Sequence, residues 1–376
     1  MEFTVNNEHF QKAMKEVSRA ISHKTPLPIL TGVKVIANQD SLTLIGSNSD
    51  IVIEKTIPAV VDGLRIVDIY QTGSIVISAK YLYEIVKKLP NQIHVKANDK
   101  QTVTIQSADI ITSLNGMNAD EYPSIPEMDE SQVVTISGKD FIDIIKQTSF
   151  AVSKNESRPI LTGVLMLFQQ GRLTVASTNS HRLALREHLI ESNINKSFIV
   201  PSSCLNELTK LIDHESDLIE IHATENHITF SMNNISIFSR LIEGNYPSIQ
   251  ELIPKDAKTV ITVNTKQLLN GIDRASLFAN EWTNNNIHLE IVDKSKLKIS
   301  SNSSQIGQIE ETQSVKTLSG ESELSISLDG SFLMDALRVI NEEDVSISFG
   351  GSMKPILIEP LSNILHLHLI SPVRTY

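Results

Sequence analysis

The hexapeptide Pro-Ile-Leu-Thr-Gly-Val stands at residues 28–33 and again at residues 159–164. The same offset of 131 residues pairs Phe10 with Phe141. Matches at one fixed offset are the signature of an internal repeat, in which each copy is one folding unit. The chain is therefore expected to consist of copies of a single module.

A third copy is fainter than the first two. The dipeptide Asn-Ser occurs at residues 48–49, 179–180 and 302–303, and Leu268 matches Phe141 at an offset of 127. The tetrapeptide Tyr-Pro-Ser-Ile stands near the ends of the first two copies, where proline would stop a strand and a linker is expected. Modules 1, 2 and 3 are accordingly predicted at residues 1–128, 129–255 and 256–376.

Each module is predicted to contain two helices and several strands. Apolar residues recur every three or four positions, as at Phe10, Met14 and Val17, which predicts a first helix. Alternating residues, as at 42–45 and 51–54, predict antiparallel strands. Second helices are expected at residues 78–89, 202–212 and 331–340. The predicted fold class is α+β, with helices covering one face of antiparallel sheets.

Composition and charge narrow the class of protein. The chain has 376 residues, a formal charge of −11 and one cysteine, so no intrachain disulfide can form. It has neither a signal-peptide pattern nor an apolar run of about 18 residues, which predicts a cytoplasmic protein. The predicted helical stretches together carry +3, which leaves −14 on the remainder. This balance argues against tight, phosphate-driven binding of nucleic acid by the whole chain.

The sequence contains no familiar catalytic or metal motif. Phosphate-loop, dinucleotide-binding, zinc-protease and nucleophile-elbow patterns are absent from it. Cys204 could be a reactive thiolate or a structural residue of a helix. His366 and His368 could be a metal pair or an ordinary pair of strand residues. We predict no catalytic residue, no metal and no cofactor.

The sharpest polar cluster is Thr-Asn-Ser-His-Arg-Leu at residues 178–183. The other two copies share its Asn-Ser, which favours a turn common to all three modules. They lack the histidine and the arginine, so the repeat does not explain His181 and Arg182. These two residues mark either a functional site or a solvated turn.

From end to end, the chain resembles the bacterial DNA polymerase III beta subunit, the replicative sliding clamp, of the low-GC Gram-positive type. The resemblance rests on the three modules and on residues 26–32, 157–163, 178–183, 240–247 and 372–376. It implies a head-to-tail homodimer whose six modules form a ring around duplex DNA without reading its bases. It also implies a non-catalytic processivity factor without a cofactor, cytoplasmic and associated with the nucleoid. The implied partners are double-stranded DNA, the DNA polymerase III alpha subunit, the clamp loader and other proteins with clamp-binding peptides.

The resemblance further implies three groups of site residues. Lys24 and Asn155 would touch DNA, with a solvated loop as the alternative. Leu277 and Phe278 would lie in the dimer interface, with core packing as the alternative. Partner peptides would enter an apolar pocket formed by modules 2 and 3, at Leu161, Thr178, His181, Arg182, Leu183, Pro247, Leu252, Met353, Pro355, Val373 and Arg374.

Two other functions stay open on the sequence alone. A monomeric peptide-binding scaffold would keep the pocket without the ring. A hydrolase or transferase would use His181 together with a carboxylate such as Asp213 or Glu243. The lack of a nucleophile or metal motif counts against the enzyme.

Overall fold

The computed structural model describes most of the 376-residue chain. Two compact units comprise Met1–Lys139 with Asn206–Leu241, and Asp140–Leu205 with Ile242–Tyr376. The predicted boundary between modules 1 and 2 lies outside the described residues. These residues are 1–22, 24–125, 133–192, 194–214, 216–279, 286–293, 295–362 and 365–373.

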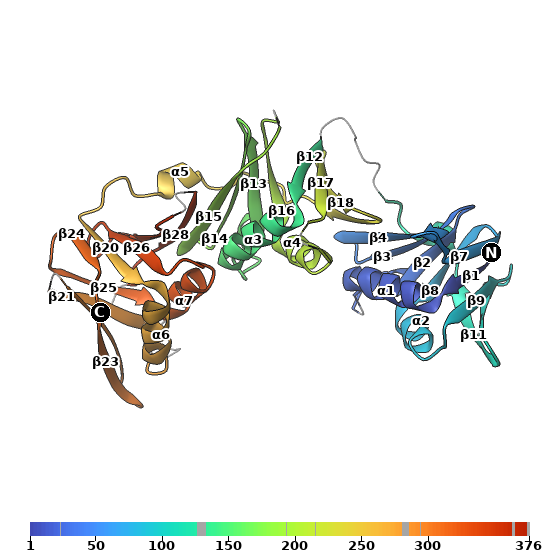
Figure 1. Cartoon of the computed structure of the whole chain (residues 1–376), viewed down its shortest axis with the longest axis horizontal. Helices are drawn as coiled ribbons and strands as arrows, with labels where there is room; N and C mark the ends of the chain where they lie inside the picture. Colours follow the sequence, from blue (N-terminus) through green and yellow to red (C-terminus); the bar gives the residue numbers. More distant parts are fainter. Residues whose placement is uncertain are drawn as a thin grey trace. The chain divides into compact units, whose positions relative to one another are not determined.

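A thirteen-stranded sheet forms most of the first unit (Figure 1). Helices α1 (Asn7–Val17) and α2 (Ala79–Val86) cover one face of it and contact each other. The strands in spatial order are β12 (Val133–Ser137), β17 (Leu218–Ala223), β18 (His227–Met232), β19 (Ile235–Arg240), β4 (Ile51–Pro58), β3 (Ser41–Ser47), β2 (Gly32–Ala37), β8 (Gly73–Ser78), β11 (Ile110–Met117), β10 (Thr102–Ser107), β9 (Gln92–Ala97), β1 (Glu2–Asn6) and β7 (Val67–Gln71). The smaller elements are the β5 (Val60–Val61) and β6 (Leu64–Arg65) hairpin and the 3-10 turns η1 (Ser18–Ala20), η2 (Pro28–Thr31) and η3 (Ala119–Glu121).

The second unit contains a nine-stranded and a four-stranded sheet. The larger has the order β16 (Lys196–Pro201), β13 (Gly163–Gln169), β14 (Arg172–Thr178), β15 (Arg182–Leu189), β28 (His366–Ile370), β27 (Ile356–Pro360), β26 (Asp344–Phe349), β20 (Thr259–Asn264) and β24 (Thr317–Gly320). The smaller has the order β23 (Gly307–Ser314), β22 (Lys296–Ser303), β21 (Asn286–Asp293) and β25 (Leu324–Asp329). The helical elements are α3 (Gly138–Thr148), η4 (Ser149–Ala151), η5 (Pro159–Thr162), α4 (Ser202–Thr209), α5 (Ile249–Leu252), α6 (Thr265–Ser276) and α7 (Gly330–Arg338), of which α3 and α4 span the division between the units.

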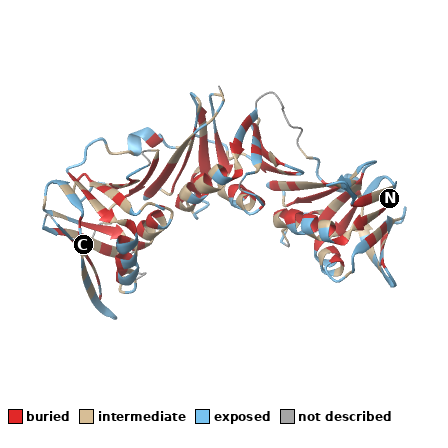
Figure 2. Ribbon diagram, viewed as in Figure 1, coloured by how far each residue is buried: buried red, intermediate tan, exposed pale blue. Residues whose placement is uncertain are grey.

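The predicted fold class is confirmed. The described ladders are antiparallel, and the helix faces turned towards the sheets carry buried residues (Figure 2). The apolar residues that predicted the first helices, including Phe10 and Leu268, are buried. Cys204 is buried on α4. Among the described helices, none is both long enough and apolar enough to cross a membrane.

The second helices are shorter than the sequence predicts. They end at Val86, Thr209 and Arg338, although apolar residues continue beyond. In each case a further backbone N–H bonds the carbonyl three residues earlier, as from Leu211 to Leu208 at 2.9 Å. Such bonds tighten the last turn, so the apolar residue still reaches the core after the α-helix has ended.

The predicted Asn-Ser turn occurs in the first two modules. The side chain of Asn179 accepts hydrogen bonds from the backbone N–H groups of His181 and Arg182, both at 3.0 Å, and Asn48 does the same in module 1. In module 3 the dipeptide belongs to β22 and its turn, and the Ser303 hydroxyl accepts the corresponding bonds instead. The third turn therefore differs from the prediction.

The first helix of module 1 approaches its sheet most closely at Gly46. A Cβ atom there would lie 2.2 Å from the carbonyl oxygen of Val17, so only glycine fits. In module 2 the equivalent Ser177 donates its hydroxyl to the carbonyl of Thr148 at 2.5 Å. The end of the first helix therefore contacts the strand in both modules. In module 1 the contact is a close approach at glycine, and in module 2 it is a hydrogen bond from serine.

We expect Gly46→Ala to lower the free energy of unfolding by about 1–3 kcal/mol, because the added methyl forces α1 away from β3. Gly350→Ala is the matched control, since the nearest atom to its Cβ belongs to the flexible Lys354 side chain, at 3.0 Å. Urea denaturation of both variants measures the difference. Equal stability of the two variants would mean that the contact at Gly46 can relax without cost.

Candidate functional site

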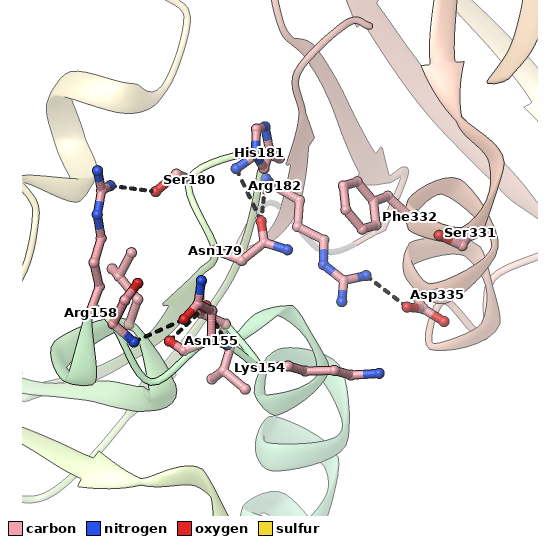
Figure 3. A pocket seen from close by; sticks show the side chains of 14 residues that line it. Lys154, Asn155, Arg158, Asn179, Ser180, His181, Arg182, Ser331, Phe332 and Asp335 are labelled. Atoms are coloured by element: carbon pink, nitrogen blue, oxygen red, sulfur yellow. Dashed lines mark hydrogen bonds and ion pairs between the residues drawn. The ribbon is translucent and has the colours of Figure 1, made fainter. Parts of the chain in front are cut away.

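A pocket of about 710 Å³ lies in the second unit, beside the loop after η4, the turn from β14 to β15 and the start of α7 (Figure 3). Leu161, His181 and Arg182, predicted for the peptide pocket, line it together with Asn155, which was predicted to touch DNA. One predicted DNA residue therefore shares a pocket with predicted peptide residues. The other lining residues are Val152, Ser153, Lys154, Ser157, Arg158, Asn179, Ser180, Ser331, Phe332 and Asp335.

The pocket lining carries a surplus of positive charge. Its carboxylate, Asp335, is paired with Arg182. Lys154 and Arg158 have no ion-pair partner among the described residues, and Arg158 Nη1 donates to Ser180 Oγ at 3.5 Å. The unpaired cations favour a ligand with an acidic group.

Sequence reasoning missed several of these residues. Arg158 stands next to the repeated hexapeptide, so that motif could have identified it. Phe332 and Asp335 belong to the second helix of module 3, and Asp335 follows Arg182 by 153 residues. No local pattern connects residues so far apart in the chain.

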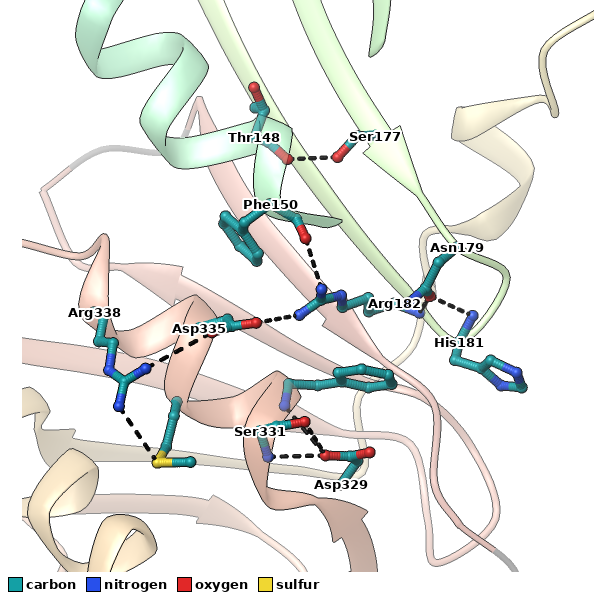
Figure 4. Close-up of polar contacts among 12 residues, drawn as sticks. Thr148, Phe150, Ser177, Asn179, His181, Arg182, Asp329, Ser331, Asp335 and Arg338 are labelled. Atoms are coloured by element: carbon teal, nitrogen blue, oxygen red, sulfur yellow. Dashed lines mark hydrogen bonds and ion pairs between the residues drawn. The ribbon is translucent and has the colours of Figure 1, made fainter. Parts of the chain in front are cut away.

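The side chain of Arg182 is held by two modules (Figure 4). Its Nη1 donates to Asp335 Oδ2 at 2.7 Å, and its Nη2 donates to the Phe150 carbonyl at 2.6 Å. The guanidinium also lies over the Phe332 and Phe150 rings, 4.4 and 5.2 Å from their centroids. Only 8% of the side chain is exposed. Arg182 is a buried cation with charge-assisted hydrogen bonds, and it ties β15 to α7.

Leu183 lies on the opposite face of the sheet, because neighbouring residues of a strand alternate in direction. It stands opposite both Thr178 and Leu369, and it is buried in an apolar cluster that Tyr246 packs against. The Tyr246 hydroxyl accepts a hydrogen bond from the Thr178 N–H at 3.0 Å. Burial raises the pKa of this hydroxyl, so it stays protonated and donates to the Gly163 carbonyl at 3.5 Å. The predicted peptide residues are thus divided between two faces.

The C-terminal segment joins the turn that carries His181. The Ser371 N–H donates to the His181 carbonyl, and the Val373 N–H donates to the Ser327 carbonyl of β25, both at 2.8 Å. Arg374 lies outside the described residues. The remaining predicted peptide residues do not line the pocket and are exposed or half-buried: Pro247, Leu252, Met353 and Pro355.

The two predicted DNA residues occupy equivalent turns in modules 1 and 2. Ser22 Oγ donates to the Lys24 carbonyl at 3.2 Å, and Ser153 Oγ donates to the Asn155 carbonyl at 3.4 Å. Both residues are exposed. Equivalent exposed turns give the two side chains similar freedom to reach a ligand.

The predicted interface residues follow α6. The side chain of Leu277 is 72% exposed, and Phe278 is half-buried. A large apolar side chain that is mostly exposed at a helix end is not packed in the core of its own module. It is available for contact with another surface.

His366 and His368 lie on β28 and are only 2% and 1% exposed. Their ring centroids are 4.5 Å apart, edge to face. Burial, with a contribution from Arg186, lowers the pKa of His366 to about 4, and burial together with His366 and Arg182 also lowers the pKa of His368. Both rings are neutral at pH 7. The described part of the chain contains no group of three or more side chains that could hold a metal ion.

Comparisons with known proteins cover the whole chain. The family described as DNA polymerase III beta subunit matches with its N-terminal domain at residues 1–126, its central domain at 135–248 and its C-terminal domain at 250–374. The beta sliding clamps of Halalkalibacterium halodurans and Bacillus subtilis are each 41% identical to the chain over the full length of both proteins. A crystal structure of the Bacillus subtilis DNA polymerase sliding clamp matches with a TM-score of 0.97 at 40% identity, and both chains are fully covered.

The chain therefore belongs to the DNA polymerase III beta subunit family. It is a DNA sliding clamp, a non-catalytic processivity subunit of the replicative polymerase that works as a dimeric ring around DNA and binds the polymerase and other partners. The monomeric scaffold and the enzyme that uses His181 are not favoured.

The buried histidines predict a loss of stability in acid. Their pKa values are about 6.5 when unfolded and lower when folded, so stability is complete above pH 6.5 and falls as the pH drops towards 4. At His366 the loss amounts to roughly 1.5 kcal/mol between pH 6.5 and 5, and protonation of His368 acts in the same direction. Replacing both histidines by glutamine should reduce this pH dependence, measured by urea denaturation. The same dependence in the variant and in the intact protein would contradict the assignment.

Proposed function

We propose that module 3 of one copy joins module 1 of a second copy, and that this contact, made twice, closes the ring. Strand pairing at the two junctions within one chain supports the proposal. The last strand of module 2, β19, pairs with β4 of module 1, and the last strand of module 3, β28, pairs with β15 of module 2. Strands β4 and β15 are equivalent, since each follows an Asn-Ser turn.

At both junctions, then, the last strand of a module pairs with the strand after the Asn-Ser turn of the module before it. Two strands of the chain lack such a junction partner. Strand β23 follows the corresponding turn of module 3 and is the terminal strand of its sheet. Strand β11 ends module 1, and one of its edges pairs with β10 along residues 110–115. Its other edge, among the described residues, pairs with β8 only at Gly116 and Met117. This other edge is therefore open at residues 110–115, and Ile111 of the strand is 66% exposed. Open strand edges favour pairing with another chain, so we infer that β23 of one copy pairs with β11 of the other.

An ion pair recurs at the same junctions. The sixth residue of each second helix is acidic: Glu84, Glu207 and Asp335. Glu207 pairs with Arg19 of module 1 at 3.2 Å, and Asp335 pairs with Arg182 of module 2. Glu84 has no ion-pair partner among the described residues. Helix α2 therefore lacks the contact with a preceding module that α4 and α7 have.

We assign this missing contact to Leu277 and Phe278 of the second copy. By the repeat offsets, Leu277 occupies in module 3 the position that Arg19 has in module 1. On α2 the Tyr81 side chain is 60% exposed, three residues before Glu84. Leu277 and Phe278 of one copy and Tyr81 of the other are exposed or half-buried apolar residues at the places where the other two junctions have their ion pair. They can bury each other in the dimer.

The peptide site is proposed around the turn that carries His181. The support is the meeting of this turn with the C-terminal segment, beside the pocket that contains Leu161 and the apolar face that contains Leu183. Concave sites of this kind combine apolar walls with a few orienting polar groups. An extended peptide could use both parts.

DNA contacts are proposed at Lys24 and Asn155, in the equivalent exposed turns. Helical stretches with +3, in a chain of −11, would leave the duplex weakly held and free to slide. We retain module boundaries after residues 128 and 255 and propose a cytoplasmic protein at the nucleoid.

The ring predicts retention that depends on the topology of DNA. The intact protein should stay on nicked circular DNA and leave once the DNA is linearised. Leu277→Ala combined with Phe278→Ala should give monomers of 41.7 kDa in sedimentation and abolish retention, because the interface loses its apolar anchors. The control is Leu189→Ala, which removes an equally exposed leucine outside the proposed interface. A double variant that stays dimeric would place the interface elsewhere, and equal loss from both DNAs would contradict the ring.

The C-terminal segment should be required for peptide binding. Deleting residues 372–376 removes the hydrogen bond from Val373 to Ser327, so affinity for a labelled peptide containing Gln, Leu and Phe should fall at least tenfold. Fluorescence polarisation measures the affinity, and sedimentation checks that the dimer persists. Deleting residues 375–376 alone leaves that bond in place and serves as the control. Equal affinity of all three proteins would move the site away from His181.

A further inference from the structure

The turn that carries His181 is internally rigid. Thr178 Oγ1 donates to the Arg182 carbonyl at 2.6 Å, and the Asn179 side chain accepts two backbone N–H groups of the same turn. Ser180 adopts a φ of 77°, in the left-handed region that such a turn requires. A unit of this kind moves as one body, so its position depends on what its ends are attached to.

Arg182 supplies the attachment at one end. Its guanidinium donates hydrogen bonds to the Asp335 carboxylate and to the Phe150 carbonyl (Figure 4). It also lies over the Phe332 ring, and its Nε has no partner among the described residues. The other groups nearby cannot neutralise it. Arg338, whose Nη1 lies 3.9 Å from Asp335 Oδ1, is itself a cation, and the buried histidines of β28 are held neutral. Asp335, whose side chain is 36% exposed, supplies the counter-ion.

The C-terminal segment depends on the same turn. The Ser371 N–H donates to the His181 carbonyl, and two residues later Val373 bonds to β25 of module 3. Helix α7 directly follows β25, so Asp335 and the C-terminal segment both connect module 3 to this one turn. Movement of the turn would displace the His181 side chain and the segment together.

We propose that Asp335 is a positioning residue of the peptide site: by holding Arg182 it fixes the His181 turn and the C-terminal segment in the arrangement that binds partner peptides. The inference rests on the proposed peptide site and assigns no peptide contact to Asp335. Supporting groups that lock a binding residue in place commonly control affinity in this way. Removing the carboxylate would leave a buried cation without its counter-ion, which favours a shift of Arg182 towards water.

The repeat provides a matched control. Glu207 is the equivalent residue of α4 and pairs with Arg19 at 3.2 Å, with side chains 24% and 29% exposed. It joins modules 1 and 2 by the same kind of ion pair. No residue of the pocket lining takes part in that pair. If the loss of any ion pair between modules weakened peptide binding, variants at Asp335 and at Glu207 would both bind weakly. If Asp335 acts by positioning the His181 turn, only the variant at Asp335 would bind weakly.

The test compares Asp335→Asn, Asp335→Glu and Glu207→Gln with the intact protein. Fluorescence polarisation with the labelled Gln-Leu-Phe peptide should show at least a tenfold loss for Asp335→Asn, recovery to within about threefold for Asp335→Glu, and no change for Glu207→Gln. Native-state hydrogen exchange should be faster at residues 180–182 and at Ser371 in Asp335→Asn alone. If Asp335→Asn does not fold, Asp335→Ser, which also lacks the carboxylate, replaces it with the same expected loss.

Full affinity in Asp335→Asn would overturn the inference, and so would an equal loss in Glu207→Gln. Unchanged exchange in a variant that binds weakly would also overturn it, because the effect would then not pass through the turn. A failure of the intact protein to bind the peptide would instead count against the proposed peptide site. The two failures are therefore distinguishable.

Discussion

Backbone pairing across the module junctions is the constraint on which the rest of the structure depends. The last strand of a module completes the sheet of the module before it, as β19 does on β4 and β28 does on β15. A ladder sets its register residue by residue, so it also decides which side chains of the helices meet. The ion pairs of Glu207 with Arg19 and of Asp335 with Arg182 follow from this register. A module by itself leaves an open edge, which is why such repeats need neighbours.

The two junctions within the chain share a fold and differ in chemistry. Ile51 in module 1 occupies the position that Arg182 has in module 2, and only the latter brings a cation into the interior. The second junction also buries His366 and His368, whose pKa values are lowered mainly by burial and further by the neighbouring cations Arg186 and Arg182. Polar groups of this kind add little stability, but they require one arrangement of their partners. The site therefore lies where the repeats diverge.

Several features could be predicted from short stretches of sequence. The spacing of Phe10, Met14 and Val17 predicts the first helix, and the Asn-Ser dipeptide predicts the turns before β4 and β15. Apolar spacing overestimates the length of the second helices, because a residue such as Leu211 stays buried through a tighter turn. The prediction also grouped Arg182 with Leu183, although alternation along a strand directs them to opposite faces.

The amino-acid sequence by itself determined the three modules, their helices and strands, and the place where one copy departs from the others. Local patterns suffice for these features, because each depends on residues within a few turns or strands. Only the tertiary structure decided that Asp335 holds Arg182, that Ser371 bonds to the His181 turn, that β23 ends its sheet and that β11 pairs with β8 at two residues alone. The first two of these contacts join residues more than a hundred positions apart, and sheet pairing, which no local pattern records, brings them together.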